Sequence, residues 1–321
     1  MRVLVSGASG FLGSALLSTL AKSPKNEAIG IYRTPPAIGH GPPNHAVIVG
    51  DLVHHEDWSA MPHFAHALIH TAARVHSLVE TAADPLAEYR RINVEGTLNL
   101  ARKAAAAGLR RFVFISTIKV NGERTAPGQA FSADDAPAPL DPYGVSKWEA
   151  EQGLREIAAR TGMEVVIIRP PLVYGPGVKG YFRTMLRWLS RGIPLPLGAL
   201  HNRRSFVNLD NLIDLIVTCI EHPAAANQTF LASDDEDMST PELLHRMGAA
   251  LGRPARLISI PTPLLKAGAA VLGKSDAVAR LCDSLCVDVV KTRRMLDWNP
   301  AISVDRGLKK TAESFLLETH A

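Results

Sequence analysis

The sequence predicts an α/β protein in which a doubly wound parallel β-sheet is joined to a smaller C-terminal lobe. Through residues 1–170, short apolar runs typical of buried strands alternate with longer stretches of helical periodicity. This alternation is typical of a parallel sheet with helices on both faces. A glycine-rich turn directly follows the first apolar run. After residue 170 the alternation becomes irregular, which indicates that later segments build a separate, smaller unit.

The first unit of the chain is a strand, a glycine turn and a helix, expected over residues 2–6, 7–13 and 14–22. Glycines in such a turn permit a tight bend and let a pyrophosphate approach the N–H groups of the helix N-terminus. They also let the helix pack closely on the strand. We therefore predict a dinucleotide-binding site of the Rossmann type. Its cofactor-contacting residues would be Gly7, Gly10, Phe11, Leu12 and Gly13.

The second and third strands end in residues suited to the adenosine half of a dinucleotide. Arg33 follows the second strand, at the place where an acidic residue usually binds the ribose 2′-hydroxyl. Because an arginine suits a 2′-phosphate instead, we favour NADP as cofactor and keep NAD as the alternative. The third strand, expected over residues 46–52, brings Asp51 to its carboxyl end. There the carboxylate could accept a hydrogen bond from the adenine amino group.

The fourth and fifth strands, expected over residues 67–73 and 110–115, end in residues suited to the reactive half of the cofactor. Ala72 is small and leaves room for it, and Arg74 follows in a loop that would line the substrate entrance. Ligands of doubly wound sheets bind at the carboxyl ends of the strands. The residues predicted at these strand ends are Gly7, Asp51, Ala72 and Thr117.

A tyrosine and a lysine share one face of the next predicted helix. If Asp141 is the N-cap and Pro142 the first helical residue, Tyr143 and Lys147 are spaced i and i+4, where helix side chains meet. A neighbouring ammonium favours the phenolate, so Lys147 should lower the pKa of Tyr143 from about 10. A tyrosine tuned in this way can act as a general acid or base. The spacing alone is common, so the surrounding motifs have to decide.

Composition argues against several classes of protein. The net charge is +4 over 321 residues, and Lys and Arg are scattered, so nucleic-acid binding is not expected. The three cysteines, Cys219, Cys282 and Cys286, suit neither a disulfide framework nor a zinc site, and no metal is predicted. Because no signal peptide is recognisable and no apolar run reaches about 18 residues, we expect a cytoplasmic protein with no membrane partner.

Several motifs follow one another along nearly the whole chain. They are Gly7-x-x-Gly10-x-x-Gly13, Asp51-Leu52, Thr117 before Tyr143-x-x-x-Lys147, Arg-Pro-Pro-Leu-Val-Tyr-Gly-Pro-Gly at 169–177, Arg204-x-Phe206-Val207, and the late segment 288–300. With this ordered set the chain resembles the extended short-chain dehydrogenases/reductases. That family comprises NAD(P)-dependent nucleotide-sugar epimerases, dehydratases and reductases.

The resemblance implies roles for particular residues. Tyr143 would be the catalytic acid/base, Lys147 would bind the nicotinamide ribose and tune Tyr143, and Thr117 would hydrogen-bond the sugar oxygen being oxidised or reduced. Arg204 matches the position that grips the nucleotide diphosphate, a task suited to a bidentate guanidinium. A UDP-sugar substrate and a homodimer are also implied. Further implied contacts are to the cofactor from Asp51, Leu52, Pro170 and Leu172, and to the substrate from Arg74 and Asn121.

The motifs also suggest how the chain is divided. Residues 1–170 are expected to form the dinucleotide-binding domain, with 205–228 returning to it. Residues 171–204 and 229–321 are expected to form the substrate-binding lobe.

Two departures from the family pattern narrow the expected activity. Sugar dehydratases of this family carry an Asp-Glu pair directly after the catalytic threonine, whereas this chain has Ile118 and Lys119. Dehydration is therefore not expected. The string Thr-Ile-Lys-Val-Asn-Gly at 117–122 resembles a subgroup of 4-epimerases that includes 4-keto-reductases for 6-deoxy-HexNAc nucleotides used in polysaccharide building.

We therefore predict an NADP-dependent reductase of a nucleotide-linked 4-keto sugar, of the 6-deoxy or HexNAc type, that supplies polysaccharide precursors. The alternative is an NAD-dependent 4-epimerase of a UDP-hexose or UDP-HexNAc. A third hypothesis, a non-catalytic NADP-binding regulator on the same fold, is disfavoured because Tyr143 and Lys147 are both present. The sequence does not identify the sugar.

Overall fold

The computed structural model describes residues 1–35, 46–54, 65–75, 83–271, 273 and 275–320. Its centre is a seven-stranded sheet in the order β3-β2-β1-β4-β5-β6-β9, in which every neighbouring pair is parallel. The strand order reverses between β1 and β4, so the predicted doubly wound sheet is confirmed. The strands are β1 (Arg2–Ser6), β2 (Glu27–Tyr32), β3 (Ala46–Ile48), β4 (Ala67–His70), β5 (Arg111–Ile115), β6 (Glu164–Arg169) and β9 (Thr229–Leu231).

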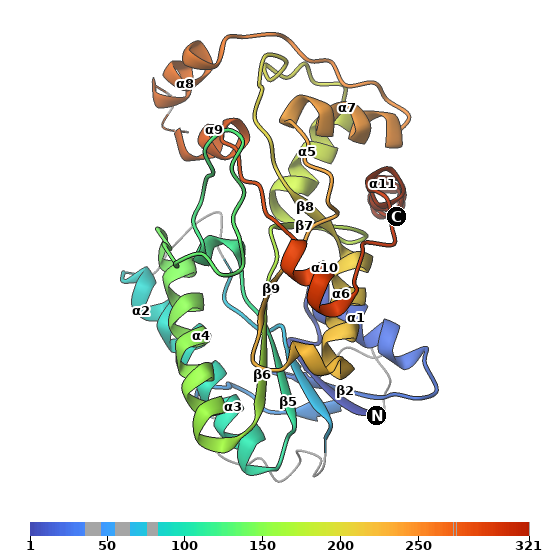
Figure 1. The fold of residues 1–321 in the computed structure, drawn as a ribbon. Helices are drawn as coiled ribbons and strands as arrows, with labels where there is room; N and C mark the ends of the chain where they lie inside the picture. The colour runs from blue at the N-terminus through green and yellow to red at the C-terminus, as the bar shows by residue number, and fades with distance from the viewer. Residues whose placement is uncertain (36–45, 55–64, 76–82, 272, 274, 321) are drawn as a thin grey trace.

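Helices cover both faces of the sheet (Figure 1). On one face, α1 (Phe11–Ala21) and α6 (Leu209–Glu221) pack on the Val3 side of β1. On the other, α3 (Gly96–Ala106) and α4 (Pro142–Thr161) pack on the Leu4 side. Because both faces are covered, the central strands are apolar throughout rather than alternating. That explains why the strands appear in the sequence as continuous apolar runs.

A smaller set of elements forms a third apolar cluster above the carboxyl ends of the strands (Figure 1). Its helices are α5 (Gly180–Ser190), α7 (Thr240–Ala250) and α11 (Val304–His320). A two-stranded parallel sheet of β7 (Leu172–Tyr174) and β8 (Phe206–Asn208) accompanies them, together with α8 (Thr262–Val271) and α9 (Ser275–Cys282). Helix α10 (Val290–Leu296) instead packs against β9, and its Leu296 belongs to the core on the Val3 side of the sheet. Within the described ranges, no helix has both the length and the apolar character needed to cross a membrane.

Three details differ from the expected elements. Residue range 229–231 forms strand β9 at the edge of the sheet, although these residues were assigned to the lobe. The long helix expected near residues 88–107 contains α2 (Pro85–Tyr89) and a π-helical segment, η1 (Arg90–Glu95), before α3. The third and fourth strands end earlier than predicted, because the apolar runs continue into loops at the sheet edge where ligands of this fold bind. Shorter helical turns are η2 (Ile118–Val120) and η3 (Pro223–Ala225).

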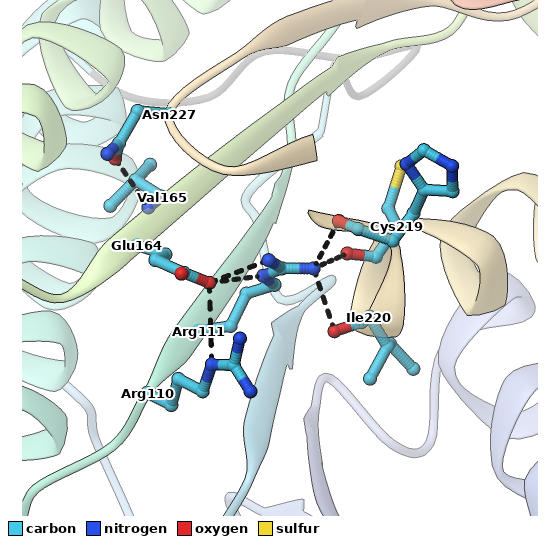
Figure 2. A network of polar contacts seen from close by, with 8 residues as sticks. Arg110, Arg111, Glu164, Val165, Cys219, Ile220 and Asn227 are labelled. Carbon is cyan, nitrogen blue, oxygen red and sulfur yellow. Dashed lines mark hydrogen bonds and ion pairs between the residues drawn. The ribbon is translucent and has the colours of Figure 1, made fainter. Parts of the chain in front are cut away.

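A buried arginine holds α6 against the sheet (Figure 2). Arg111 begins β5, is 1% exposed, and forms a 2.7 Å ion pair with Glu164 at the start of β6. Its Nη1 donates to three backbone carbonyls at the end of α6, those of Cys219, Ile220 and His222, each at 2.9 Å. These carbonyls have no partners within the helix, so the guanidinium satisfies them and complements the helix dipole. Segment 209–222 is thereby fastened to the sheet, as Figure 2 shows.

Candidate active site

The glycine turn forms a cradle that a side chain would fill. Gly7 has φ +73°, and a Cβ there would lie 2.6 Å from the backbone nitrogen of Ala72. A Cβ on Gly13 would lie 2.2 Å from the Gly7 carbonyl oxygen. Glycine is therefore required at both positions. The close approach at Gly7 shows that the end of β1 lies directly against Ala72, just after β4. The contact of Ala72 with the cofactor stays a prediction.

Helix α1 opens at this cradle. Gly10 is its N-cap and offers no side chain to the helix, so the first amides, those of Phe11, Leu12 and Gly13, are open to an anion. A dinucleotide pyrophosphate fits such a place: the turn is tight, the backbone is uncovered, and a helix dipole points at it. The residues at the glycine turn therefore fit the predicted cofactor.

The residues expected near the adenosine lie at the next two strand ends. Arg33 is exposed and directly follows β2. Asp51 lies beyond β3, where its carboxylate accepts from the Val53 amide and forms a 3.1 Å ion pair with Arg91 of η1. The Val53 hydrogen bond and the Arg91 charge lower the pKa of Asp51. Leu52 is half-buried, and its carbonyl accepts from Asn99 of α3. Contact of Arg33, Asp51 and Leu52 with adenosine stays a prediction.

Three catalytic candidates gather at the end of β5. Thr117 is the N-cap of η2, and its hydroxyl accepts from the Lys119 amide at 3.3 Å. Asp141 is the N-cap of α4, accepting from the Gly144 amide at 2.6 Å, and Pro142 is the first helical residue, as predicted. Tyr143 is therefore in the first turn of α4 and Lys147 in the second. Helix α4 packs against η2, so Thr117 and the tyrosine–lysine pair lie on adjoining elements.

The ionisation of this pair differs from the expectation. The pKa of Tyr143 is raised, first by burial and then by the negative charge of Asp141 and by Tyr89. Lys147 does not reverse this, because its ammonium lies 3.8 Å above the ring centre of Phe114 and is itself 1% exposed. Burial lowers the pKa of Lys147 to about 7, partly opposed by Glu151 one turn further along α4. The predicted lowering of the Tyr143 pKa was wrong for this structure, because burial and the Asp141 charge both raise it.

A buried polar network underlies the candidate residues. Glu151, fully buried on α4, accepts from Ser116 at 2.5 Å and from two guanidinium nitrogens of Arg169 at the end of β6. Arg169 also donates to Asn121 at 2.9 Å, and Asn121 donates to the Ser132 carbonyl. Both ends of the Asn121 amide are thus engaged inside the protein. This argues against the predicted substrate contact for Asn121 and gives it a structural role.

The end of β6 connects to the threonine loop. The Pro170 carbonyl accepts from the Ile118 amide at 3.0 Å, next to Thr117. Leu172 begins β7 and is 41% exposed. Both residues therefore lie at the same sheet edge as the glycine cradle, where the predicted cofactor contacts require them. Those contacts remain a prediction.

The two arginines expected to meet substrate lie on different elements. Arg74, after β4, places its guanidinium 5.5 Å from the ring centre of Tyr89, which in turn packs edge-on against Tyr143 at 6.0 Å. Arg204 belongs to the C-terminal cluster, and its Nη1 donates to the carbonyls of Arg280 and Asp283 at 3.0 Å. Burial lowers the pKa of Arg204. Its predicted grip on a diphosphate stays a prediction.

Several residues of the site were not predicted as functional. Asn93 in η1 binds the backbone of Arg74 on both sides and donates to Ser146 of α4, so the π-helical segment ties the β4 loop to the catalytic helix. π-Helical segments commonly mark functional sites. Glu151 also had a signal in the sequence, because it continues the i, i+4 series of Tyr143 and Lys147 on the inward face of the helix. Tyr89 had none.

Comparison with known proteins agrees with this geometry. A UDP-glucose 4-epimerase from Vibrio cholerae is 43% identical over 318 residues, covering 98% of this chain and 95% of the relative. The crystal structure of UDP-glucuronic acid 4-epimerase from Bacillus cereus with UDP-glucuronic acid and NAD superposes with a TM-score of 0.78 at 22% identity, covering 99% of this chain and 100% of the other. RMD from Pseudomonas aeruginosa, complexed with NADPH, superposes with a TM-score of 0.75 at 21% identity and covers 98% and 99% of the two chains.

Both structural likenesses concern the fold. Residues 3–232 match the description "NAD dependent epimerase/dehydratase family", and the match to the Vibrio relative covers 95% of that protein. The family resemblance seen in the motifs is thus confirmed. The chain is an NAD(P)-dependent enzyme of the extended short-chain dehydrogenase type and belongs to the NAD dependent epimerase/dehydratase family.

Proposed function

We propose that this enzyme is a 4-epimerase of a UDP-hexose or UDP-HexNAc, with NAD as the cofactor that it retains. The observation that carries the proposal is the 43% identity to a UDP-glucose 4-epimerase over 98% of this chain. The geometry supports it, since Thr117 follows β5, α4 with Tyr143 and Lys147 packs against η2, and the glycine turn follows β1 at the same edge of the sheet. The sequence motifs favoured an NADP-dependent 4-keto-reductase, but the identity to a UDP-glucose 4-epimerase favours the alternative, an NAD-dependent 4-epimerase.

The chain's own residues would handle the substrate and its protons. Tyr143, as phenolate, would take the proton of the sugar 4-hydroxyl and later return it to the 4-oxygen. Thr117 would hydrogen-bond that oxygen, and Lys147 would bind the nicotinamide ribose. When bound, NAD accepts the hydride from carbon 4 and gives it back. The 4-keto sugar must turn over between the two steps, so that hydride returns to its other face.

The residues after Thr117 support hydride chemistry at one carbon. Elimination of water needs an additional acid and base beside the sugar. Ile118 is 4% exposed, and Lys119 forms ion pairs with Glu123 and Asp141. Neither supplies a carboxylate to the sugar. Loss of water is therefore not part of the proposed reaction.

One observation favours a second candidate function. Arg33 is exposed directly after β2, where an acidic side chain would select NAD. An arginine there suits a 2′-phosphate, and an enzyme that uses NADPH would reduce a UDP-4-keto sugar rather than epimerise a hydroxyl. The residues around carbon 4 would be the same for both reactions.

The dinucleotide and the product separate the two functions. Acid release of the cofactor from purified enzyme should give NAD, and UDP-glucose or UDP-GlcNAc should convert to its 4-epimer by NMR without added cofactor. The reductase would instead consume added NADPH at 340 nm with a UDP-4-keto-6-deoxy sugar. Stoichiometric NADPH loss together with no epimer from any UDP-sugar in the panel would overturn the epimerase proposal.

A further inference from the structure

Lys119 occupies an unusual place in the site. It lies two residues after Thr117, and its ammonium forms ion pairs with Glu123 at 3.2 Å and with Asp141. The Lys119 side chain is 27% exposed and that of Asp141 is 21% exposed. This pair is therefore sheltered compared with the described surface pairs, which makes it less subject to screening.

Asp141 connects Lys119 to the catalytic helix. One carboxylate oxygen of Asp141 accepts from the Gly144 amide and so caps α4, while the other meets Lys119. In the sequence, Tyr143 lies between the capping residue, Asp141, and Gly144, whose amide donates to the Asp141 carboxylate. Any rotation of the Asp141 carboxylate would therefore loosen the turn that carries the phenol.

Lys119 also touches the other catalytic element through its backbone. Its amide donates to the Thr117 hydroxyl at 3.3 Å. A Cβ on Gly144 would lie 3.1 Å from the Lys119 carbonyl, so the threonine loop and the first turn of α4 are in direct contact. Lys119 thus contacts Thr117 through its backbone amide and the N-cap of the Tyr143 helix, Asp141, through its ammonium.

The charges around Tyr143 come from several elements. Asp141 caps the helix that carries Tyr143, and Lys147 lies one turn further along it. Tyr89 of α2 packs against the Tyr143 ring, with the Arg74 guanidinium over Tyr89, while Lys119 of η2 is paired with Asp141 and with Glu123. The Asp141 charge disfavours the phenolate that the proposed reaction needs. The Lys119 ammonium forms an ion pair with that same carboxylate, and a paired positive charge offsets the field of a carboxylate on its neighbours.

We propose that Lys119 is a positioning residue for Tyr143. By holding Asp141 it fixes the first turn of α4 against the Thr117 loop and offsets the negative charge beside the phenol. The expected effect of Lys119 on turnover rests on the proposed 4-epimerase function. The expected effect of Lys119 on the cap of α4 rests on geometry alone.

The test compares three variants of the full-length enzyme. Lys119→Met removes the charge, and Lys119→Arg keeps it. Lys310→Met is the matched control, because Lys310 forms a 2.6 Å ion pair with Asp210, which is in the first turn of α6, another helix. Profiles of kcat and KM against pH are measured with the UDP-sugar that the parent enzyme epimerises. Hydrogen exchange of the Gly144 amide is measured in the same proteins.

In Lys119→Met, kcat should rise at a pH about half to one unit higher than in the parent, because the phenolate of Tyr143 is harder to form. That is roughly a three- to tenfold loss of kcat at pH 7 with KM nearly unchanged. The Gly144 amide should exchange faster. Lys119→Arg and Lys310→Met should both match the parent. A kcat loss that is equal at every pH, or an unchanged profile, would overturn the charge role.

Failure of the proposed function can be told apart from failure of this inference. If the parent epimerises no UDP-sugar, the proposed function fails while the exchange measurement still decides whether Lys119 holds the helix cap. Gly144 exchange in Lys119→Met equal to that in the parent would overturn the positioning role, whatever the activity. Faster exchange in Lys119→Met but not in Lys310→Met would support it.

Discussion

At the scale of single residues, burial sets the charges of the site. Lys147 is 1% exposed above Phe114, and burial brings its pKa to about 7. His70 lies nearby, hydrogen-bonded to Ser6 and Thr97, and burial followed by the Lys147 charge lowers its pKa to about 3. His70 is therefore neutral at physiological pH, so Lys147, which titrates near pH 7, is the member of this pair that can carry positive charge there.

Replacing Lys147 should stabilise the ligand-free enzyme while abolishing turnover. The folded-state pKa of Lys147 is below its unfolded value, so the folded state loses stability as pH falls from about 10.5 towards about 7. Lys147→Met removes this penalty and should raise Tm, more at pH 7 than at pH 10. Calorimetry at both pH values checks this, and a Tm gain that is equal at both would contradict the role of the charge.

Removing the Tyr143 hydroxyl should abolish the proton transfer and leave the fold intact. Tyr143→Phe keeps the ring that packs against Tyr89, so we expect kcat to fall by about 10²- to 10⁴-fold while UDP binding by calorimetry stays within a few-fold of the parent. Activity equal to that of the parent would remove Tyr143 from the mechanism.

At the scale of elements, the packing of helices on the sheet depends on a few buried polar groups. Arg111 joins β5, β6 and α6, and Glu151 joins α4 to the ends of β5 and β6. Asn93 joins the π-helical segment to α4. Each group satisfies partners on elements distant in sequence, so its loss should loosen the junction between elements.

Loss of the Arg111 guanidinium should destabilise the fold strongly. Arg111→Met removes the buried guanidinium from the carbonyls of Cys219 and Ile220, from that of His222 just after α6, and from the Glu164 carboxylate, which should lower the free energy of unfolding by about 3–5 kcal/mol. Arg110→Met is the matched control: its side chain is 71% exposed and 3.8 Å from Glu164, so we expect a change below about 1 kcal/mol. Urea unfolding measures both, and equal losses would refute the capping role.

Adding a methyl group at the glycine turn should block the cofactor. In Gly13→Ala the Cβ would lie 2.2 Å from the Gly7 carbonyl, which forces α1 away from the end of β1. We expect the purified variant to carry less than a tenth of the parent's bound dinucleotide. Gly268→Ala is the control, because among the described residues no atom outside its own helical backbone lies within 4 Å of a Cβ placed there and its site is helical, so cofactor content should not change.

At the scale of the whole molecule, helices α3 and α4 lie side by side on an outer face of the sheet (Figure 1). An ion pair between Arg90 and Glu149 joins η1 to α4 across this face. Trp148 on α4 is only partly buried in the single chain. Partly exposed aromatic residues are enriched in protein interfaces.

We therefore expect a homodimer formed through this face. Light scattering should give about twice the 34.6 kDa chain mass, and Trp148→Glu should shift the protein towards the chain mass. A parent that elutes as a single chain at micromolar concentration would contradict the dimer. Trp188→Glu, at a partly buried tryptophan on α5, is the control for adding a charge at such a position.

The sequence predicted much of the fold and the candidate site because these depend on local spacing. The strands of the sheet, the glycine turn, the Asp141 cap and the shared helix of Tyr143 and Lys147 follow from neighbours a few residues apart. Strand β9 did not, because its three residues pair with β6 more than 60 positions earlier. The π-helical segment was missed because residues 88–107 have the periodicity of one helix, although a backbone hydrogen bond of Asn93 could be expected from its polar side chain amid apolar residues.

The sequence by itself thus determined the class of fold and the family, and it gave the candidate residues for the chemistry. Only the tertiary structure decided which charges meet: Lys119 with Asp141, Glu151 with Arg169, and Arg111 with the end of α6. It also reversed the expected shift of the Tyr143 pKa. The physical reason is that helix spacing fixes the direction of a side chain, whereas desolvation and ion pairing depend on segments that folding brings from far along the chain.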